Sequence, residues 1–191
     1  MVMKTRVSLE AFLAMPETEP ASELIDGEVV QKPGANIRMG RLSSRLIGLL
    51  YRHCDGHPET IVANELSHIF RGLECVLVPE VSVFSRSRLP RTKEALMAGL
   101  EGPPDFAIEV LSPGTTYART AERAAFYMRS GTRLLWIVDP QDEVVAVHRP
   151  DEPVTIHRAP EIVDASPVLS AFSLDLASLF SVLHEGEELQ S

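Results

Sequence analysis

The stretch PPDFAIEVLSP, residues 103–113, is the most informative part of this sequence. Two prolines begin it and a Ser-Pro-Gly break ends it ahead of a helical pattern, so the apolar run between them is typical of a buried strand. A carboxylate as deep in such a run as Glu109 is costly unless a cation, a hydrogen-bond network or a metal compensates it. Alternation on a strand would give one face Phe106, Ile108 and Val110, and the other Asp105, Ala107, Glu109 and Leu111.

The composition indicates one globular domain. A chain of 191 residues can bury a sizeable core, and its 45% hydrophobic and 24% charged residues are ordinary proportions. We predict a single domain over residues 1–184 and an acidic, frayed tail over residues 185–191. No apolar run is long enough to span a bilayer. Cys54 and Cys75 show neither metal-ligand spacing nor a disulfide framework, so we expect a cytoplasmic protein with no membrane partner.

The charge distribution bears on nucleic-acid binding. The formal net charge is −9, which argues against loose, non-specific binding to nucleic acid but leaves room for a local basic groove. Arginines in a helical stretch and in a long connection could line such a groove; they are Arg38, Arg41, Arg45, Arg52, Arg86, Arg88 and Arg91. The alternative is a solvated helix face followed by a surface loop.

Local patterns predict a mixture of helices and strands. Asp26-Gly27, between two short apolar runs, predicts a β-hairpin with a two-residue turn. Apolar periodicity predicts helices over residues 38–53 and 115–130, and Gly131 is placed as the C-terminal stop of the second. Short helices are expected at 9–15, at 93–100 and in the late SLDLASLF stretch. Strands are expected at 105–111, 133–138, 144–149 and 154–157, and two or three within 60–84, interrupted near Arg71-Gly72.

Glu109 needs a partner from another strand. Residues four apart on one strand are about 13 Å apart, so Asp105 cannot share an ion with it. The best candidate is Glu80 in VLVPEVSVF, another carboxylate within an apolar run. From neighbouring strands the two side chains could converge on Mg²⁺, which lowers the pKa of a bound water and stabilises a pentacovalent phosphate. The alternative from the residues alone is that each carboxylate pairs with one of the arginines.

Several motifs together resemble a known family. They are the ELIDGE hairpin, VLVPEVSVF, PPDFAIEVLSP, RAAFYMRSGTRLLWIVDP and the late VLSAFSLDLASLF stretch, so the likeness runs from about Leu9 to Phe180. The sequence is similar to the Uma-type putative restriction endonuclease family of the PD-(D/E)xK nuclease superfamily. The resemblance implies an α/β (α+β), restriction-endonuclease-like core with a mixed, bent β-sheet flanked by helices. It also implies a site that cleaves phosphodiester bonds with Mg²⁺, or with Mn²⁺ in its place.

The resemblance assigns roles to four carboxylates. Glu80 would be the first metal-binding acid, where the family usually has aspartate, and Glu109 would be the second. Asp105 would be the acid that opens the same motif as Glu109. Glu23 would match the glutamate of the family's hairpin element. These residues would support one catalytic site, with Glu80 and Glu109 as the metal ligands.

The lysine of the superfamily motif is the main departure from the pattern. It would fall at Leu111, which cannot serve, and the family instead supplies a lysine four residues before a tyrosine on the following helix. That position is Arg123, before Tyr127, an i, i+4 pair on one helix face. Arginine stays protonated, so it can orient a water or a phosphate but cannot transfer a proton. Tyr127 could donate to a site carboxylate or simply pack, and Met39 stands where the family often has histidine.

Three hypotheses follow from the sequence. The first is an Mg²⁺-dependent endonuclease that cleaves DNA, for which a homodimer with two sites would suit cutting both strands. The second is a catalytically degenerate protein on the same scaffold that acts as a binding or regulatory module. The third is a buried ion-pair network with no metal, in which Glu109→Gln would change stability and leave any response to metal unchanged.

Overall fold

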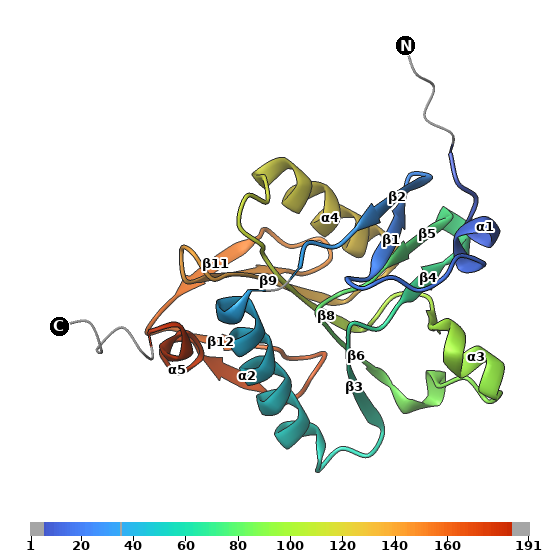
Figure 1. Cartoon of the computed structure of the whole chain (residues 1–191). Coiled ribbons are helices and arrows are strands. Elements are labelled where there is room, and N and C mark those ends of the chain that lie inside the picture. The colour runs from blue at the N-terminus through green and yellow to red at the C-terminus, as the bar shows by residue number, and fades with distance from the viewer. Residues whose placement is uncertain (1–5, 35, 185–191) are drawn as a thin grey trace.

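The structure is a computed structural model that describes residues 6–34 and 36–184. Its larger sheet is almost entirely antiparallel, and only its two central neighbours, β8 and β9, run parallel (Figure 1). In spatial order its strands are β11 (Thr155–Arg158), β10 (Val144–His148), β9 (Leu134–Asp139), β8 (Phe106–Val110), β6 (Val81–Ser85) and β3 (Thr60–Asn64). The strand expected from the PPDFAIEVLSP stretch is therefore β8, and it lies inside this sheet.

A smaller sheet lies next to the first and carries the predicted hairpin. In spatial order its strands are β2 (Glu28–Gln31), β1 (Ser22–Ile25), β5 (Cys75–Leu77), β4 (His68–Phe70) and β7 (Leu100–Glu101). Asp26 and Gly27 form the hairpin turn with φ values of 50° and 75°, as a two-residue turn with the twist of the strands requires. The two-residue hairpin is confirmed.

The run of residues 60–84 differs from the expectation. It forms four strands rather than two or three, because the chain breaks at Pro79-Glu80 and passes from the smaller sheet into the larger one. Before the break β5 pairs with β1 and β4, and after it β6 pairs with β3 and β8. Proline has no amide hydrogen for a ladder, which makes it a natural place for the strand to end. Glu80 therefore lies at a junction between sheets, not within a strand.

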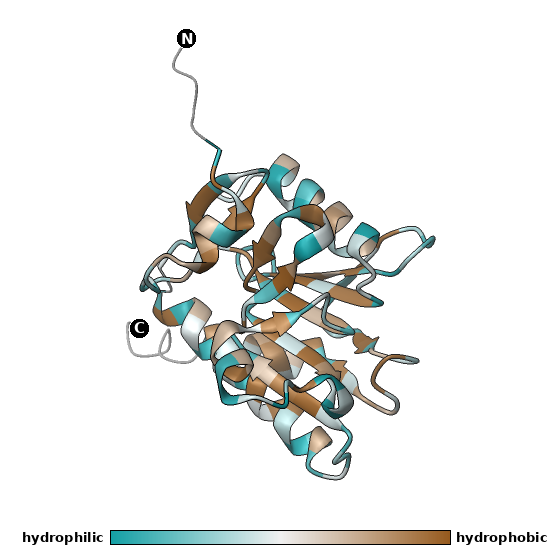
Figure 2. Cartoon of the chain, turned by 90° about the vertical axis from the view of Figure 1, so that its right-hand side faces the viewer, coloured by the Kyte–Doolittle hydropathy of each residue, from teal (hydrophilic) through white to brown (hydrophobic). Residues whose placement is uncertain are grey.

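Two helices cover opposite faces of the larger sheet. The first, α2 (Ile37–Cys54), packs Leu42, Leu46 and Leu50 against one face of β8, and the second, α4 (Tyr117–Ser130), packs Ala124 and Tyr127 against the other. Figure 1 shows the two helices on either side of β8 and β9. The predicted alternation is confirmed, since Phe106, Ile108 and Val110 lie in the first core and Ala107 in the second. Figure 2 shows mostly apolar strands and helices along which polar and apolar residues alternate.

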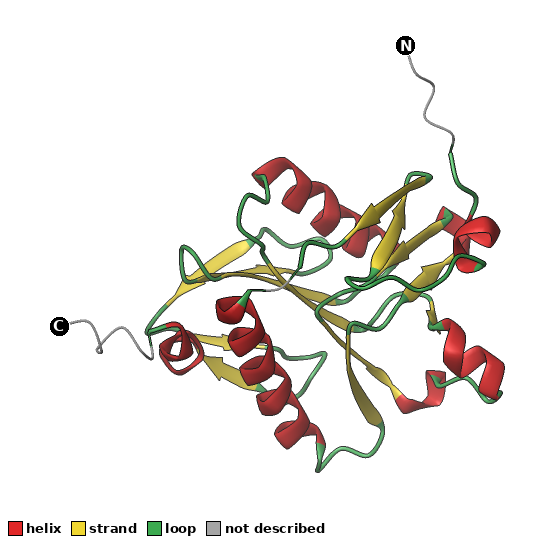
Figure 3. Ribbon diagram, viewed as in Figure 1, coloured by secondary structure: helices red, strands yellow, loops and turns green. Residues whose placement is uncertain are grey.

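The remaining elements complete the layers around the strands (Figure 3). Gly131 ends α4 at φ 101°, as predicted. The late SLDLASLF stretch, expected to be helical throughout, divides into a strand and a helix. That strand and helix are β13 (Ser173–Asp175) and α5 (Leu176–Phe180). The other remaining elements are α1 (Leu9–Leu13), α3 (Lys93–Ala98) and β12 (Ile162–Asp164), with 3-10 turns at Arg71–Leu73, Arg86–Arg88 and Ser181–Leu183.

The predicted fold class, a mixed α+β core flanked by helices, is confirmed. Among the described helices, none is long and apolar enough to cross a membrane. The predicted frayed tail, residues 185–191, lies outside the described residues.

Candidate active site

Glu109 lies on β8 and Glu80 directly precedes the neighbouring strand β6, whereas the sequence analysis expected both acids within strands. Strands β6 and β8 pair antiparallel with Val81 opposite Ile108, so the next residue on each chain brings Glu80 across from Glu109. Directly opposed residues on such a pair lie on the same face of the sheet. Glu109 sits near the carboxyl end of β8, and Glu80 lies in the bend directly before β6. Both acids therefore lie on the side of the larger sheet where the two sheets join, and Lys32 reaches Glu80 there.

Glu109 is held on one side by three donors. Its Oε1 accepts hydrogen bonds from Arg123 Nε at 2.7 Å and from the Tyr127 hydroxyl at 2.6 Å, and Arg123 Nη2 lies 2.6 Å from the same oxygen. Burial raises the pKa of the Glu109 carboxyl, and the cations Arg123 and Lys32 act against that rise. Among the described residues, its second oxygen, Oε2, has no hydrogen bond or ion pair.

Arg123 joins this acid to the hairpin. Its Nη1 and Nη2 each donate to Glu23 at 2.7 Å, so the guanidinium binds one carboxylate with both terminal nitrogens. Burial alone would lower the pKa of Arg123, but Glu109 and Glu23 outweigh it and raise that pKa well above its ordinary value. The Arg123 side chain thereby fixes helix α4 to β8 and β1. Arg123 and Tyr127, the predicted i, i+4 pair, both donate to the carboxylate of Glu109.

Glu23 has a second structural contact. Its Oε1 accepts the backbone N–H of Val78 at 2.7 Å, in the segment where the chain leaves β5. That amide has no strand partner at the break, and an unmet buried donor would be costly. Glu23 thus accepts the hydrogen bond of the Val78 amide at the junction between the sheets and also binds Arg123. The structure therefore brings Glu23 into the cluster with Glu109, as the sequence analysis expected.

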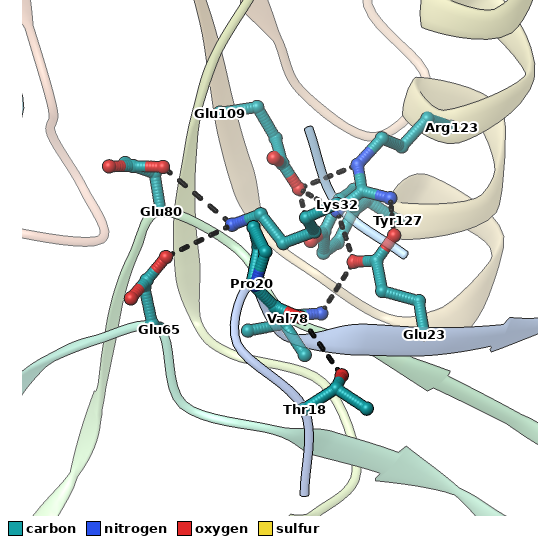
Figure 4. Close-up of polar contacts among 10 residues, drawn as sticks. All are labelled: Thr18, Pro20, Glu23, Lys32, Glu65, Val78, Glu80, Glu109, Arg123 and Tyr127. Carbon is teal, nitrogen blue, oxygen red and sulfur yellow. Dashed lines mark hydrogen bonds and ion pairs between the residues drawn. The ribbon is translucent and has the colours of Figure 1, made fainter. Parts of the chain in front are cut away.

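Lys32 enters the cluster from the end of β2. Its Nζ lies 3.6 Å from Glu80 Oε2 and 3.8 Å from Glu65 Oε1 (Figure 4). The side chain is 13% exposed, and Nζ itself is buried without a hydrogen-bond partner among the described residues. Figure 4 shows the lysine reaching toward Glu65 and Glu80, with Glu109 and Arg123 close by. A second cation therefore belongs to the site, although no motif in the sequence indicated it.

The structure does not bring Asp105 to this cluster. Asp105 precedes β8 at its opposite end, and its Oδ2 accepts the backbone N–H of Ser85 at 3.1 Å. It terminates the pairing of β6 with β8, which is a structural task. The expectation that Asp105 supports the same site as Glu109 is corrected accordingly. Leu111, at the superfamily lysine position, packs against the core formed by α4, as a leucine should.

The arginines of the long connection also have structural partners. Arg86 donates to the backbone carbonyl of Pro58, and Arg88 donates to the carbonyls of Pro103 and Glu101. These contacts fix the loop against the start of β8 and leave both guanidinium groups engaged. On α2, Arg45 donates to Ser178 at 2.8 Å. The predicted groove of arginines is thus not assembled from residues 86–88.

Two observations test whether a divalent metal fits the site. Within residues 6–34 and 36–184, no group of three or more histidine, cysteine or acidic side chains is already arranged around one ion position. Mg²⁺, however, commonly uses one or two carboxylates and keeps several waters. Four carboxylates and two cations, Glu23, Glu65, Glu80, Glu109, Lys32 and Arg123, leave a formal balance of −2, and one divalent cation would cancel it. The donor set therefore fits Mg²⁺ bound by Glu80 and Glu109.

Sequence reasoning missed two members of the cluster. Lys32 follows the hairpin strand directly before a proline, and Glu65 follows β3 with φ 47°, a left-handed conformation. Neither lies in an apolar run, which is the signal that identified Glu80 and Glu109. Tyr127 was detectable from its spacing to Arg123, and its hydroxyl does donate to Glu109.

The fold of this chain is similar to that of a solved protein structure. A crystal structure of a putative nuclease belonging to DUF820 from Anabaena variabilis ATCC 29413 is similar to this chain, with a TM-score of 0.82 and 30% identity. The match covers 93% of this chain and 99% of that one, so the fold is that of a nuclease-like domain.

Residues 9–177 match the Uma2 family, described as putative restriction endonucleases. The chain belongs to that family, which confirms the resemblance inferred from its motifs. Among curated proteins, none matches the chain.

Proposed function

We propose that this protein is a metal-dependent endonuclease that hydrolyses phosphodiester bonds of DNA. The observation that carries the proposal is that Glu80 directly precedes β6 next to Glu109 of the paired strand β8, with the ammonium of Lys32 near Glu80. Membership of a restriction endonuclease family supports DNA as the substrate. Mg²⁺ is the proposed cofactor, and Mn²⁺ would serve in its place.

Glu80 and Glu109 are the proposed metal ligands. Because Arg123 and Tyr127 occupy Oε1 of Glu109, its Oε2 is the oxygen left to face an ion. A bound Mg²⁺ would supply Lewis acidity, lowering the pKa of a ligated water and offsetting charge on the phosphate. The protein's own part is to hold two hard oxygen ligands in register and to keep Glu109 oriented.

Arg123 acts mainly as a positioning residue in this proposal. Three of its nitrogens already contact carboxylates, so little of its hydrogen-bonding capacity remains for a scissile phosphate. Its charge still favours a phosphate nearby, and its contacts fix the rotamer of Glu109. Tyr127 fixes the same carboxylate from the neighbouring turn of α4, because burial and the adjacent Glu109 raise its pKa and keep the hydroxyl protonated.

A groove follows the loop after β8 and could take part of the substrate. It has a volume of about 300 Å³ and passes Leu111 at the end of β8; its lining includes Arg38, Ser112 and Thr115. A cation and two hydroxyls suit contacts to phosphate oxygens. Leu111 lies two residues after Glu109 in the chain, which links the groove to the strand that carries this acid.

The decisive experiment is cleavage of supercoiled plasmid DNA with Mg²⁺ or Mn²⁺. Glu109→Gln keeps the size of the side chain and an acceptor for Tyr127, and it should lower the cleavage rate by more than about 100-fold, since even outer partners of metal ligands are worth 10–100-fold. Glu152→Gln, at an exposed turn between β10 and β11, is the matched control and should cleave like the wild type. Equal rates for both variants would refute the proposal.

A catalytically degenerate binding module is the second candidate. Two observations favour it: Leu111 fills the superfamily lysine position, and Arg123 is held by Glu23 and Glu109. Such a protein would bind DNA without cutting it. Electrophoretic mobility shifts in the presence of Ca²⁺, together with the absence of cleavage in Mg²⁺ and Mn²⁺, would select this candidate over the nuclease.

The remaining parts of the proposal concern location and assembly. We place the protein in the cytoplasm, which the two free, buried cysteines, Cys54 and Cys75, support. A homodimer would present two sites to the two strands of a duplex. Sedimentation with and without duplex DNA tests that assembly.

A further inference from the structure

The backbone of Lys32 is fixed at the end of the hairpin. Its N–H donates to the carbonyl of Ala21 at 2.8 Å, which extends the hairpin pairing by one residue beyond Gln31. Pro33 follows directly and restricts the chain there. From there the side chain reaches the junction of the sheets, where Glu80 lies (Figure 4).

The carboxylates that meet Lys32 are presented as a pair. The N–H of Glu65 donates to the carbonyl of Glu80 at 3.2 Å, just past the ladder of β3 with β6, and both side chains reach the same ammonium. Glu65 adopts φ 47° to do so. The pair is thus built into the fold at the ends of two adjacent strands.

The contacts of the ammonium are incomplete. An ammonium group has three N–H donors, yet both carboxylate oxygens lie beyond 3.5 Å and Nζ makes no hydrogen bond among the described residues, although it is buried. Arg123, by contrast, holds its carboxylates at 2.6 to 2.7 Å. Lys32 supplies positive charge to the acidic pair without the directional bonds that would lock it there.

We propose that the ammonium of Lys32 is a stand-in for the divalent cation, held between Glu65 and Glu80 until the cation displaces it. The inference rests on the proposed metal site and adds two residues to it: Glu65 as a further acid and Lys32 as the group that competes with the ion. Lysine suits this task because it is a compact point charge on a flexible stem, whereas arginine would form a fixed fork on the carboxylates.

The proposal sets an order of metal affinities for three proteins. Lys32→Met removes the competing charge and keeps an apolar stem, so Mn²⁺ should bind about tenfold tighter or more than to the wild type, given the strength of a unit charge about 4 Å away. Lys32→Arg keeps the charge and adds directional bonds to Glu65 and Glu80, so Mn²⁺ should bind more weakly. A lysine with a merely structural role would loosen the site in both variants.

Isothermal titration calorimetry with Mn²⁺ is the measurement, and the rise in Tm on adding Mn²⁺ is a second readout. Lys93→Met, on the exposed face of α3, is the matched control and should bind Mn²⁺ like the wild type. Unchanged or weaker binding by Lys32→Met would overturn the proposal. Should that variant fail to fold, Glu65→Gln at a half-exposed side chain replaces it and must weaken Mn²⁺ binding; unchanged binding would overturn the proposal.

Cleavage assays on the same proteins separate this inference from the proposed function. A wild type that cuts no DNA, with Mn²⁺ binding that still tightens in Lys32→Met, would refute the nuclease and support the displaced lysine. A wild type that cuts DNA, with the same Mn²⁺ affinity in Lys32→Met, would support the nuclease and refute the displaced lysine. If both hold, the Mn²⁺ concentration for half-maximal cleavage should fall in Lys32→Met in step with the binding constant.

Discussion

The two halves of the acidic cluster are built differently. Around Arg123, the carboxylates of Glu23 and Glu109 are held by short hydrogen bonds of 2.6 to 2.7 Å. Around Lys32, the carboxylates of Glu65 and Glu80 lie 3.6 to 3.8 Å away with no hydrogen bond. The first half is also the more enclosed, with side-chain exposures of 5% and 9% for its acids against 18% and 52% for the other two.

This contrast separates a structural task from an exchangeable one. In the enclosed half, a single guanidinium joins α4, β8 and β1, so its removal would affect the packing of both sheets. In the looser half, two carboxylates, one of them half exposed, lie near the buried ammonium of Lys32 without hydrogen bonds to it. Low dielectric strengthens the first set of contacts and makes any unpaired member of it costly. We therefore expect the fold to depend on Arg123, whereas the proposed metal site requires Lys32 to give way to another cation.

Removing Arg123 should have the largest effect on stability. Arg123→Met would leave Glu23 and Glu109 buried without their counter-ion, and breaking such a pair costs about 3–5 kcal/mol in free energy of unfolding. Urea denaturation followed by tryptophan fluorescence measures it, because Trp136 is fully buried in the adjacent core. Arg123→Lys retains the charge and should lose less. A loss under about 1 kcal/mol for Arg123→Met would show that the enclosed half is not structural.

A buried histidine outside the cluster should give the next largest effect, through pH. Burial lowers the pKa of His68 from 6.5 to about 4, and the nearby Arg88 acts in the same direction. Since the unfolded chain binds a proton below pH 6.5 and the folded chain does not until about pH 4, stability is complete above pH 6.5. It should fall by about 3 kcal/mol as the pH drops toward 4.

His68→Asn tests this assignment. The amide nitrogen can take the place of Nδ1, which lies 3.0 Å from the carbonyl of Gly102, and the new side chain does not titrate. The difference in unfolding free energy between wild type and variant should shrink between pH 6.5 and 4. A difference that is constant over that range would assign the acid sensitivity to the carboxylates of the cluster instead.

Tyr127→Phe probes the enclosed half more gently than the arginine substitution. It removes only the hydroxyl that donates to Glu109 at 2.6 Å, and a hydrogen bond to a charged group contributes about 1.5–3 kcal/mol. The pKa of Glu109 should rise further, because this hydrogen bond acts to lower it. Thermal unfolding at several pH values measures both effects. Tyr117→Phe, at a side chain that is 89% exposed, is the control and should unfold like the wild type.

In the enclosed half, local patterns indicated Glu109, and the family resemblance pointed to Glu23 and Arg123. Glu109 interrupts an apolar strand, Glu23 precedes a two-residue turn, and Arg123 lies one helical turn before Tyr127. Periodicity and turn chemistry depend on residues close together in the chain, so the elements that they predict form in the structure. The same signals gave β8, the hairpin and the two long helices with ends correct to within about two residues.

The looser half could not be predicted, because its geometry depends on contacts between distant segments. Lys32 follows the end of β2 and Glu65 follows the end of β3, both outside any apolar run. The two side chains lie close together only because the two sheets join at Pro79-Glu80. The same junction explains why the run of residues 60–84 was expected to hold fewer strands. Asp105 shows the converse error, since a motif position suggested a site residue and the carboxylate instead accepts the N–H of Ser85.

Lys32→Met should produce the smallest loss of stability, which completes the contrast between the halves. Its ion pairs lie beyond hydrogen-bond distance and one partner is half exposed, so solvent screens much of the interaction, and about 1 kcal/mol of unfolding free energy should be lost in metal-free buffer. The loss should disappear when Mn²⁺ is added, because an ion that binds only the folded protein stabilises it. Urea titrations with and without Mn²⁺ on Lys32→Met and Arg123→Met measure this directly. If Mn²⁺ restores the unfolding free energy of Arg123→Met as well, a metal ion can replace the cation in both halves. If Mn²⁺ restores it in Lys32→Met alone, a metal ion replaces only the cation of the looser half.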